Sequence, residues 1–143
     1  MSLSNAIAEL TKAFAGTLVE PHGTTYNDVR RVHNGYIDKR PALVAQCRGT
    51  ADIADAVKLA RAQKLEIAVK GGGHNVAGRA TCEGGLMIDL SHMRQVNVDP
   101  HKKIAWAGGG TTWKDFNRET QQFGLATTGG VVSSTGVAGL TLG

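Results

Sequence analysis

The stretch Glu66-Ile67-Ala68-Val69-Lys70-Gly71-Gly72-Gly73-His74-Asn75 joins an apolar segment to three glycines and a histidine. Apolar residues alternate along 65–70 with the period of a β-strand, and Leu65, Ile67 and Val69 are predicted on its buried face. The glycines allow positive φ and a close approach of the main chain to a ligand. Free N–H groups in such a turn bind anions. The stretch therefore predicts a strand that ends at a backbone anion site, beside the nucleophilic side chain of His74.

A glycine run alone is also typical of a flexible turn, so the surrounding chain has to decide between the two interpretations. A strand over 43–47 and a helix through Ala62, with Thr50 as its N-cap, precede the strand at 65–70. Together they predict a βαβ unit, in which phosphate sites favour the carboxyl ends of the strands. A Rossmann fold does not fit, because Gly78 interrupts the segment after His74 and no helical period follows the glycines.

The rest of the sequence predicts one long helix before this unit, one after it, and several strands. An amphipathic helix is predicted from Leu3 to Gly16, and loops with a short helix near 26–33 fill the rest of 17–40. A strand at 86–90 and a hairpin of 95–98 with 104–107 follow. A helix is then predicted to start at Thr111 or Thr112 and to stop at Gly124, and its buried face carries Trp113, Phe116 and Phe123.

The last segment, 127–143, is small, hydroxylated and rich in glycine. Such a segment suits a polyphosphate or a flat ring lying against the main chain, because few side chains stand in the way. A buried glycine-rich crossover is the alternative interpretation.

Composition limits the function classes. The 143 residues fit one domain of about 100–200 residues. The net charge of +4 is scattered along the chain without interleaved aromatic residues, so a nucleic-acid partner is not expected. No signal-peptide core or membrane span is present, and the two cysteines, Cys47 and Cys82, lack CxxC spacing. Buried, reduced thiols in a cytoplasmic protein and no membrane partner are therefore expected.

No metal site is predicted, because the other histidines are interpreted as loop or structural residues: His22, His33, His92 and His101.

Several motifs occur together in one order, at 47–57, 69–78, 85–93, 108–113 and 136–143. In this order they resemble the flavin-binding N-terminal half of the FAD-linked oxidases of the vanillyl-alcohol oxidase and berberine-bridge-enzyme type, the PCMH-type FAD domain. The resemblance implies an α+β fold: a small mixed-sheet subdomain built on the βαβ unit, and the start of a second subdomain with an antiparallel sheet. It also implies a helical leader with loops at 1–40 and an FAD-binding domain at 41–143 that stops before the family's further strands and substrate domain.

The resemblance also implies site residues. Gly71, Gly72, Gly73 and Asn75 would contact the FAD pyrophosphate through the backbone, with Gly78 in the same motif. The second glycine-rich segment would complete the cradle with Gly129, Gly130, Ser134, Thr135, Gly136, Val137 and Gly139. His74 matches the histidine that bonds covalently to the methyl carbon on the flavin's benzenoid ring in many members. Val132 occupies the position of the second, cysteinyl attachment, so a single bond is expected.

The implied function is the FAD-binding part of a flavin-dependent oxidoreductase. The parent enzyme would take hydride from a small organic substrate, such as an alcohol, sugar, amine or alkaloid-like compound, and pass the electrons to O2. No catalytic base is identified, since Tyr26 and Tyr36 match no family position, and the segment alone is expected to be inactive. Two alternatives remain open at this stage: a noncovalent FAD reductase that uses NADPH, and a nucleotide-binding module without catalysis.

Overall fold

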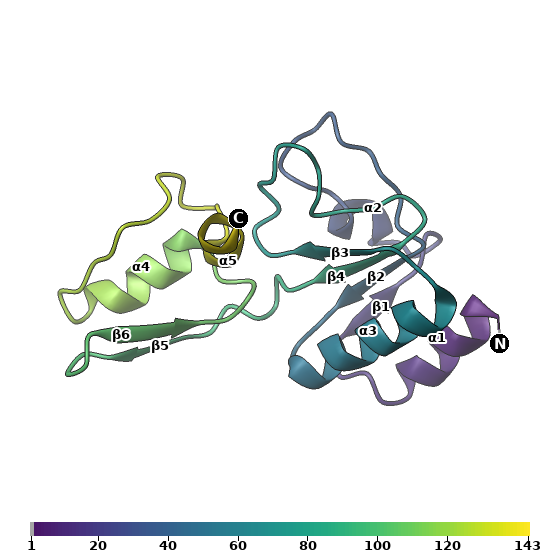
Figure 1. Ribbon diagram of the computed structural model, residues 1–143, viewed down its shortest axis with the longest axis horizontal. Coiled ribbons are helices and arrows are strands. Elements are labelled where there is room, and N and C mark those ends of the chain that lie inside the picture. The colour runs from purple at the N-terminus through teal and green to yellow at the C-terminus, as the bar shows by residue number, and fades with distance from the viewer. Residues whose placement is uncertain (1) are drawn as a thin grey trace.

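The computed structural model describes residues 2–143 and contains two sheets. Its helices are α1 (Leu3–Thr11), α2 (Tyr26–Val29), α3 (Thr50–Gln63), α4 (Trp113–Gln121) and α5 (Val137–Leu142), and its strands are β1 (Thr17–Val19), β2 (Leu43–Gln46), β3 (Ile67–Lys70), β4 (Leu86–Asp89), β5 (Val96–Asp99) and β6 (Ile104–Ala107). Figure 1 shows β1 to β4 with the first three helices on one side of the molecule, and the β5–β6 hairpin with α4 and α5 on the other. The predicted α+β class, with a mixed sheet and a separate antiparallel sheet, is confirmed.

The larger sheet has the strand order β1-β2-β4-β3. β2, β4 and β3 are parallel, whereas β1 pairs with β2 in the antiparallel direction. The predicted βαβ unit is present, but β4 lies between its two strands. Gln46 and Lys70, the last residues of β2 and β3, are both in register with Asp89 of β4. The loops that follow these strands therefore leave the sheet from one edge, where ligands of α/β sheets bind.

The two faces of this sheet are covered by different helices. One face, with Leu43 and Ile88, packs against α1 and α3 in the main core, while α2 lies over the other face (Figure 1). On that second face Tyr26 is fully buried against Val44 and Met87, and its hydroxyl donates a hydrogen bond of 2.6 Å to the Pro41 carbonyl oxygen. The first thirty residues thus contribute to both cores, where each fully buried large apolar side chain stabilises the fold by about 1.5–3 kcal/mol.

The predicted buried face of β3 is wrong. Ile67 and Val69 are 38% and 53% exposed, whereas Ala68 between them is buried. β3 is the edge strand of the sheet, and the core on the α3 side is formed mainly over β2 and β4. Alternation therefore predicted the strand but not the side of it that is covered.

Three local expectations about helices and strands also need correction. The first helix ends at Thr11 and does not continue to Gly16, and β1 occupies part of the segment predicted to be loops. Gly49, not Thr50, is the N-cap of α3, so Thr50 is its first helical residue. α5 lies within the glycine-rich segment 127–143, for which no helix was predicted. Local patterns disfavour this helix, because a glycine such as Gly139 inside a helix costs about 1 kcal/mol relative to alanine.

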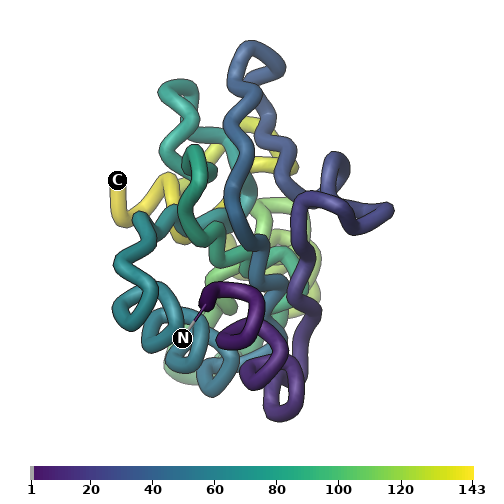
Figure 2. Tube along the Cα trace, turned by 90° about the vertical axis from the view of Figure 1, so that its right-hand side faces the viewer, coloured from purple at the N-terminus to yellow at the C-terminus, as the bar shows by residue number. Residues whose placement is uncertain are grey.

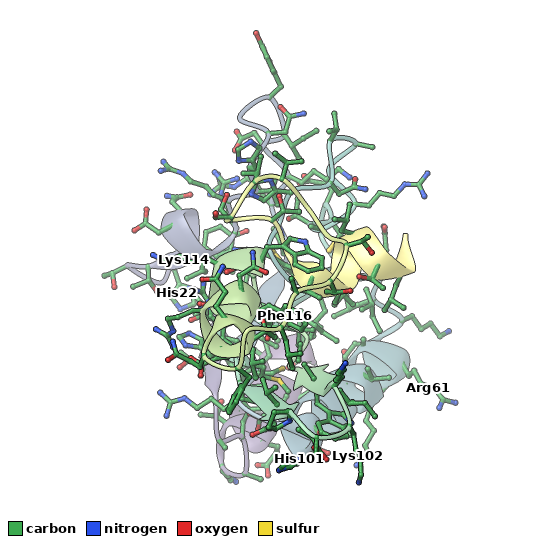
Figure 3. The ribbon with its side chains drawn as sticks, turned by 90° about the vertical axis from the view of Figure 1, so that its left-hand side faces the viewer. His22, Arg61, His101, Lys102, Lys114 and Phe116 are labelled. Carbon is green, nitrogen blue, oxygen red and sulfur yellow. The ribbon has the colours of Figure 1, made fainter. Side chains whose placement is uncertain are left out.

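The second sheet agrees with the predicted hairpin. The Asp99 carboxylate accepts hydrogen bonds from the N–H groups of His101 and Lys102, 3.1 and 3.0 Å away, which closes the turn. Figure 3 shows His101 and Lys102 at this turn, at the opposite end of the second subdomain from Lys114 of α4.

The helix α4 packs through one aromatic pair. Thr112 donates to the Asp115 carboxylate through its N–H (3.1 Å) and its hydroxyl (2.7 Å), which fixes the start of the helix. Trp113 is buried and contacts Phe116 edge to face, with ring centroids 5.5 Å apart. The prediction that Phe123 is buried is wrong, since it is 50% exposed: it follows the last helical residue, where the chain turns at Gly124 with φ +66°.

Both cysteines are buried and unpaired, as predicted. Burial, assisted by the charges of Asp52 and Asp89, raises the pKa of Cys47 to about 12. Burial also raises the pKa of Cys82. Since the thiolate is the reactive form, both thiols are chemically inert in the folded chain.

Asp52 connects the N-terminal segment to the start of α3. It is 3% exposed, and its two carboxylate oxygens accept from the N–H groups of Ala15 and Arg48, each at 2.9 Å. Ala15 lies between α1 and β1, and Arg48 lies between β2 and α3. The side chain therefore satisfies two backbone donors that no helix or strand would otherwise pair.

Replacing Asp52 is expected to destabilise the chain. D52A leaves two partly buried donors without an acceptor, so the free energy of unfolding should fall by about 2 kcal/mol or more. Urea denaturation followed by circular dichroism measures this change. The matched control is D55A on the same helix, where the loss of the partly exposed pair with Lys58 should cost less than about 0.5 kcal/mol. Equal effects of the two substitutions would contradict the role given to Asp52.

Candidate functional site

The two glycine-rich segments predicted to share a ligand meet in space. A Cβ added to Gly72 would overlap the backbone nitrogen of Gly136 and lie 3.1 Å from the Ser134 carbonyl oxygen. A Cβ on Gly71 would lie 2.9 Å from the Gly109 carbonyl oxygen. Only glycine permits this main-chain contact between the loop after β3 and the segment before α5. We call this contact the glycine junction.

The loop after β3 presents a run of free backbone donors. Within residues 2–143, no hydrogen-bond acceptor lies in reach of the N–H groups of Gly71, Gly72, Gly73, His74 and Asn75. Gly73 is buried and has φ +71°, a left-handed conformation that turns the peptide groups around it. Buried or partly buried N–H groups are normally paired, so consecutive unpaired ones indicate a ligand acceptor. A run of unpaired N–H groups around a left-handed glycine is typical of an anion-binding nest.

The His74 ring lies beside the glycine junction and is held by the other segment. Its Nε2 atom is 3.1 Å from Ser134 Oγ, and its Nδ1 atom is 3.4 Å from Thr135 Oγ1. Each hydroxyl can donate or accept, so the neutral ring is satisfied in either tautomer. Desolvation by burial, and secondly the positive charge that His33 can carry, lower the pKa of His74 below its ordinary value. The imidazole is therefore neutral, and nucleophilic, near pH 7.

Three cavities include the His74 ring, and two of them are also lined by the glycine-rich loop after β3. The first, of about 330 Å³, is lined by Val69, the 71–75 loop, Arg79, Ala80, Thr135, Gly136, Gly139, Leu140 and Gly143. The second, of about 530 Å³, lies between the two subdomains and is lined by Gly71, Gly72, His74, Ser133, Ser134 and by the basic residues Arg31, Lys70, Arg94 and Lys114. Both volumes fall within the range of small-molecule sites, about 300–1,000 Å³.

The basic residues of the second cavity differ in how free their charges are. Lys70, the last residue of β3, donates to the Val29 carbonyl oxygen at 2.8 Å and lies 3.8 Å from Asp89. Its charge is therefore already partly compensated. Lys114, at the start of α4, has no ion-pair partner among residues 2–143 (Figure 3). The electrostatic attraction for an anion at this cavity thus depends more on Lys114 than on Lys70.

Not every predicted site residue lines a cavity. Gly78 has φ +70°, and a Cβ there would lie 2.7 Å from the Ile37 side chain. Gly129 and Gly130 pack on the Trp113 indole, and the Val137 N–H already donates to the Thr111 carbonyl oxygen at 2.9 Å. These four residues shape the loops around the site, while the other predicted residues line it: Gly71, Gly72, Gly73, His74, Asn75, Ser134, Thr135, Gly136 and Gly139.

One residue of the site was missed in the sequence. The His33 ring stacks on the His74 ring with centroids 4.0 Å apart and planes 12° apart. His33 was interpreted as an exposed loop residue, because no residue near it in the chain has a spacing that signals a partner. His33 is exposed, as interpreted, in spite of this stack, and His22, His92 and His101 are also exposed.

Residues 2–143 contain neither a membrane-spanning helix nor a metal cluster. Of the helices in residues 2–143, none is both long and apolar enough to cross a membrane. The same residues contain no group of three or more His, Cys, Asp or Glu side chains placed to hold a metal ion.

Comparison with known proteins identifies the family of this chain. Residues 41–143 match a family described as an FAD-binding domain. The chain belongs to this family. (R)-6-Hydroxynicotine oxidase of Paenarthrobacter nicotinovorans is 35% identical over 127 residues, which are 89% of this chain and 28% of that protein.

Solved structures agree with the assignment of this FAD-binding domain. The crystal structure of 6-hydroxy-D-nicotine oxidase from Arthrobacter nicotinovorans superposes with a TM-score of 0.85 at 33% identity, over 87% of this chain and 28% of that one. A berberine-bridge-enzyme-like protein of Physcomitrella patens has a TM-score of 0.88 at 21% identity, over 100% and 31% of the two chains, a likeness that concerns the fold. The FAD-binding domain described here spans less than a third of the length of these relatives.

The glycine junction can be tested by adding one methyl group. G72A forces the two main chains apart, so the free energy of unfolding should fall by about 1–3 kcal/mol. FAD affinity should fall with it, since the free N–H groups of the loop are displaced. Urea denaturation and titration with FAD, followed by flavin fluorescence, measure the two effects. The control is G35A, because a Cβ at Gly35 meets no atom within 4 Å. A G72A chain that behaves like the control would rule out the junction as a constraint.

Proposed function

We propose that this chain is the FAD-binding part of a flavin-dependent oxidase and that it holds FAD covalently through His74. The observation that carries the proposal is the position of the His74 ring. It is neutral, it contacts a hydroxyl at each nitrogen, and it follows directly on the free N–H groups of 71–73. One short segment thus offers both an anion site and a nucleophile.

The residues of the site fit two parts of FAD, the charged pyrophosphate and the reactive flavin ring. The pyrophosphate carries negative charge, which the free N–H groups of the loop after β3 would bind without any side chain. Lys114, Arg31 and Arg94, around the second cavity, add positive charge from both subdomains. The glycine junction holds the two segments together, so the donors are already in place before FAD binds.

The covalent step needs a neutral imidazole and an oxidant. A C–N bond would form between a ring nitrogen of His74 and the methyl carbon of the benzenoid ring, while one N–H and one C–H bond break. The two protons and two electrons released in this step pass to O2. Protonation of His74 would remove the lone pair that forms the bond, so surroundings that disfavour the imidazolium favour the reaction.

In the parent enzyme, bound FAD would accept hydride from a small organic substrate and pass the electrons to O2. The chain's own residues bind and orient the cofactor in this scheme. Neither tyrosine acts as its base: the Tyr26 hydroxyl is buried and donates to Pro41, and Tyr36 is fully exposed. The proposal therefore places substrate recognition and the base outside the residues described here.

The proposal predicts a covalent adduct at one histidine. When the chain is produced with FAD in air and then denatured in acid, the pellet should stay yellow, and the intact mass should rise by one FAD less two hydrogen atoms. H74N should abolish the adduct, because an amide nitrogen is not nucleophilic. H92N, which changes an exposed histidine after β4, should keep it. A colourless pellet from the unsubstituted chain, or an adduct on the H74N chain, would reject the proposal.

A further inference from the structure

The loop that carries His33 is fastened to the loop that carries His74. The His33 N–H donates to the Gly73 carbonyl oxygen at 2.9 Å, and Asn34 Nδ2 donates to the Val76 carbonyl oxygen at 2.8 Å. Figure 2 shows the two loops, in blue and teal, rising side by side from the same edge of the sheet. The stacked histidine rings thus belong to a contact between two loops that one backbone hydrogen bond and one Asn34 side-chain hydrogen bond also hold.

The stack completes the restraint on the His74 ring. Ser134 and Thr135 contact the two ring nitrogens, which leaves rotation of the ring about these contacts. A second planar ring at 4.0 Å and 12° covers one face and removes that freedom. The edge that carries the nitrogens is then held in one plane, as a nucleophile must be for attack on a fixed carbon.

The same contact also affects the charge of His74. The residues lining the three cavities that include this ring contain no Asp or Glu, within the part of the chain that the structure describes, but they contain five further cations: Arg31, Lys70, Arg79, Arg94 and Lys114. Two stacked imidazoles 4.0 Å apart cannot both carry a proton without strong repulsion. The ring contact, the burial and the surrounding positive charges therefore all favour the neutral form of His74.

We propose that His33 is a positioning residue for flavin attachment, which holds the His74 ring in one plane and keeps it neutral. This role rests on the covalent attachment proposed above. His33 itself forms no bond to the flavin and acts through His74. The His33 ring comes from the loop between α2 and β2, whereas the glycine junction joins the loop after β3 to the segment before α5.

Two substitutions separate the two effects of His33. H33F keeps an aromatic ring for stacking but carries no proton, whereas H33A removes both the ring and the charge. In the FAD-free chain, NMR titration of His74 should give a higher pKa in both variants than in the unsubstituted chain, since the repulsive neighbour is gone. The H92A chain should show no change. This measurement does not depend on FAD or on activity.

The rate of covalent attachment gives the second readout. After FAD is added in air, intact mass followed over time should show H33A reacting about 10–100-fold more slowly at pH 8, because the His74 ring is no longer oriented. H33F should keep its rate at pH 8 within about threefold. At pH 6 the attachment rate of H33F should be lower than that of the unsubstituted chain, because the raised pKa leaves more His74 protonated.

Each outcome decides a part of the proposal. An unchanged His74 pKa in folded H33A and H33F chains would overturn the electrostatic role, and an unchanged rate in H33A would overturn the positioning role. If H33A does not fold, as judged by circular dichroism, H33F still decides the question through its pKa and pH profile. If the unsubstituted chain forms no adduct, the proposed covalent attachment fails, and the titration alone judges the effect of His33 on His74.

Discussion

The main-chain contact between Gly72 and Gly136 is the constraint on which the rest of the site depends. It brings the loop at the carboxyl end of β3 against the segment before α5, with no side chain between them. Because this contact occupies the Cβ positions on both sides, it fixes where the free N–H groups of the loop point and where Ser134 and Thr135 stand relative to His74. The two subdomains are therefore joined at the place where we propose that FAD binds.

The larger sheet positions the loop that makes this contact. Its parallel strands end in register at Gln46, Lys70 and Asp89, so the loops that form the site leave one edge together. Buried Asp89 accepts from Gln46 Nε2 and the Ser91 N–H, and lies 3.8 Å from Lys70 Nζ, which links the ends of all three strands. A buried carboxylate with this many partners stabilises the edge of the sheet, because each donor around it would otherwise be unsatisfied.

Much of this arrangement was predictable from the sequence, and the failures share a cause. The strand into the glycines, the hairpin closed by Asp99 and the helix start at Thr112 are set by neighbouring residues, so local patterns found them. The exposure of Ile67 and Val69 depends on which strand lies at the sheet edge, and α5 depends on contacts of its first residues with Thr111 and Thr112. The His33 stack depends on two loops that are distant in the chain. Those features are properties of the tertiary structure, which no local period reports.

The central claim is that the free N–H groups of Gly71, Gly72 and Gly73 bind the phosphate groups of FAD beside His74. Backbone amide NMR of the labelled chain, recorded during titration with FAD, tests it most directly. The account predicts that the amide resonances of 71–75 and of 134–136 shift together and saturate at one equivalent of FAD, while those of the hairpin turn at 99–103 stay in place. Saturable shifts confined to other segments, with 71–75 unchanged, would contradict the account.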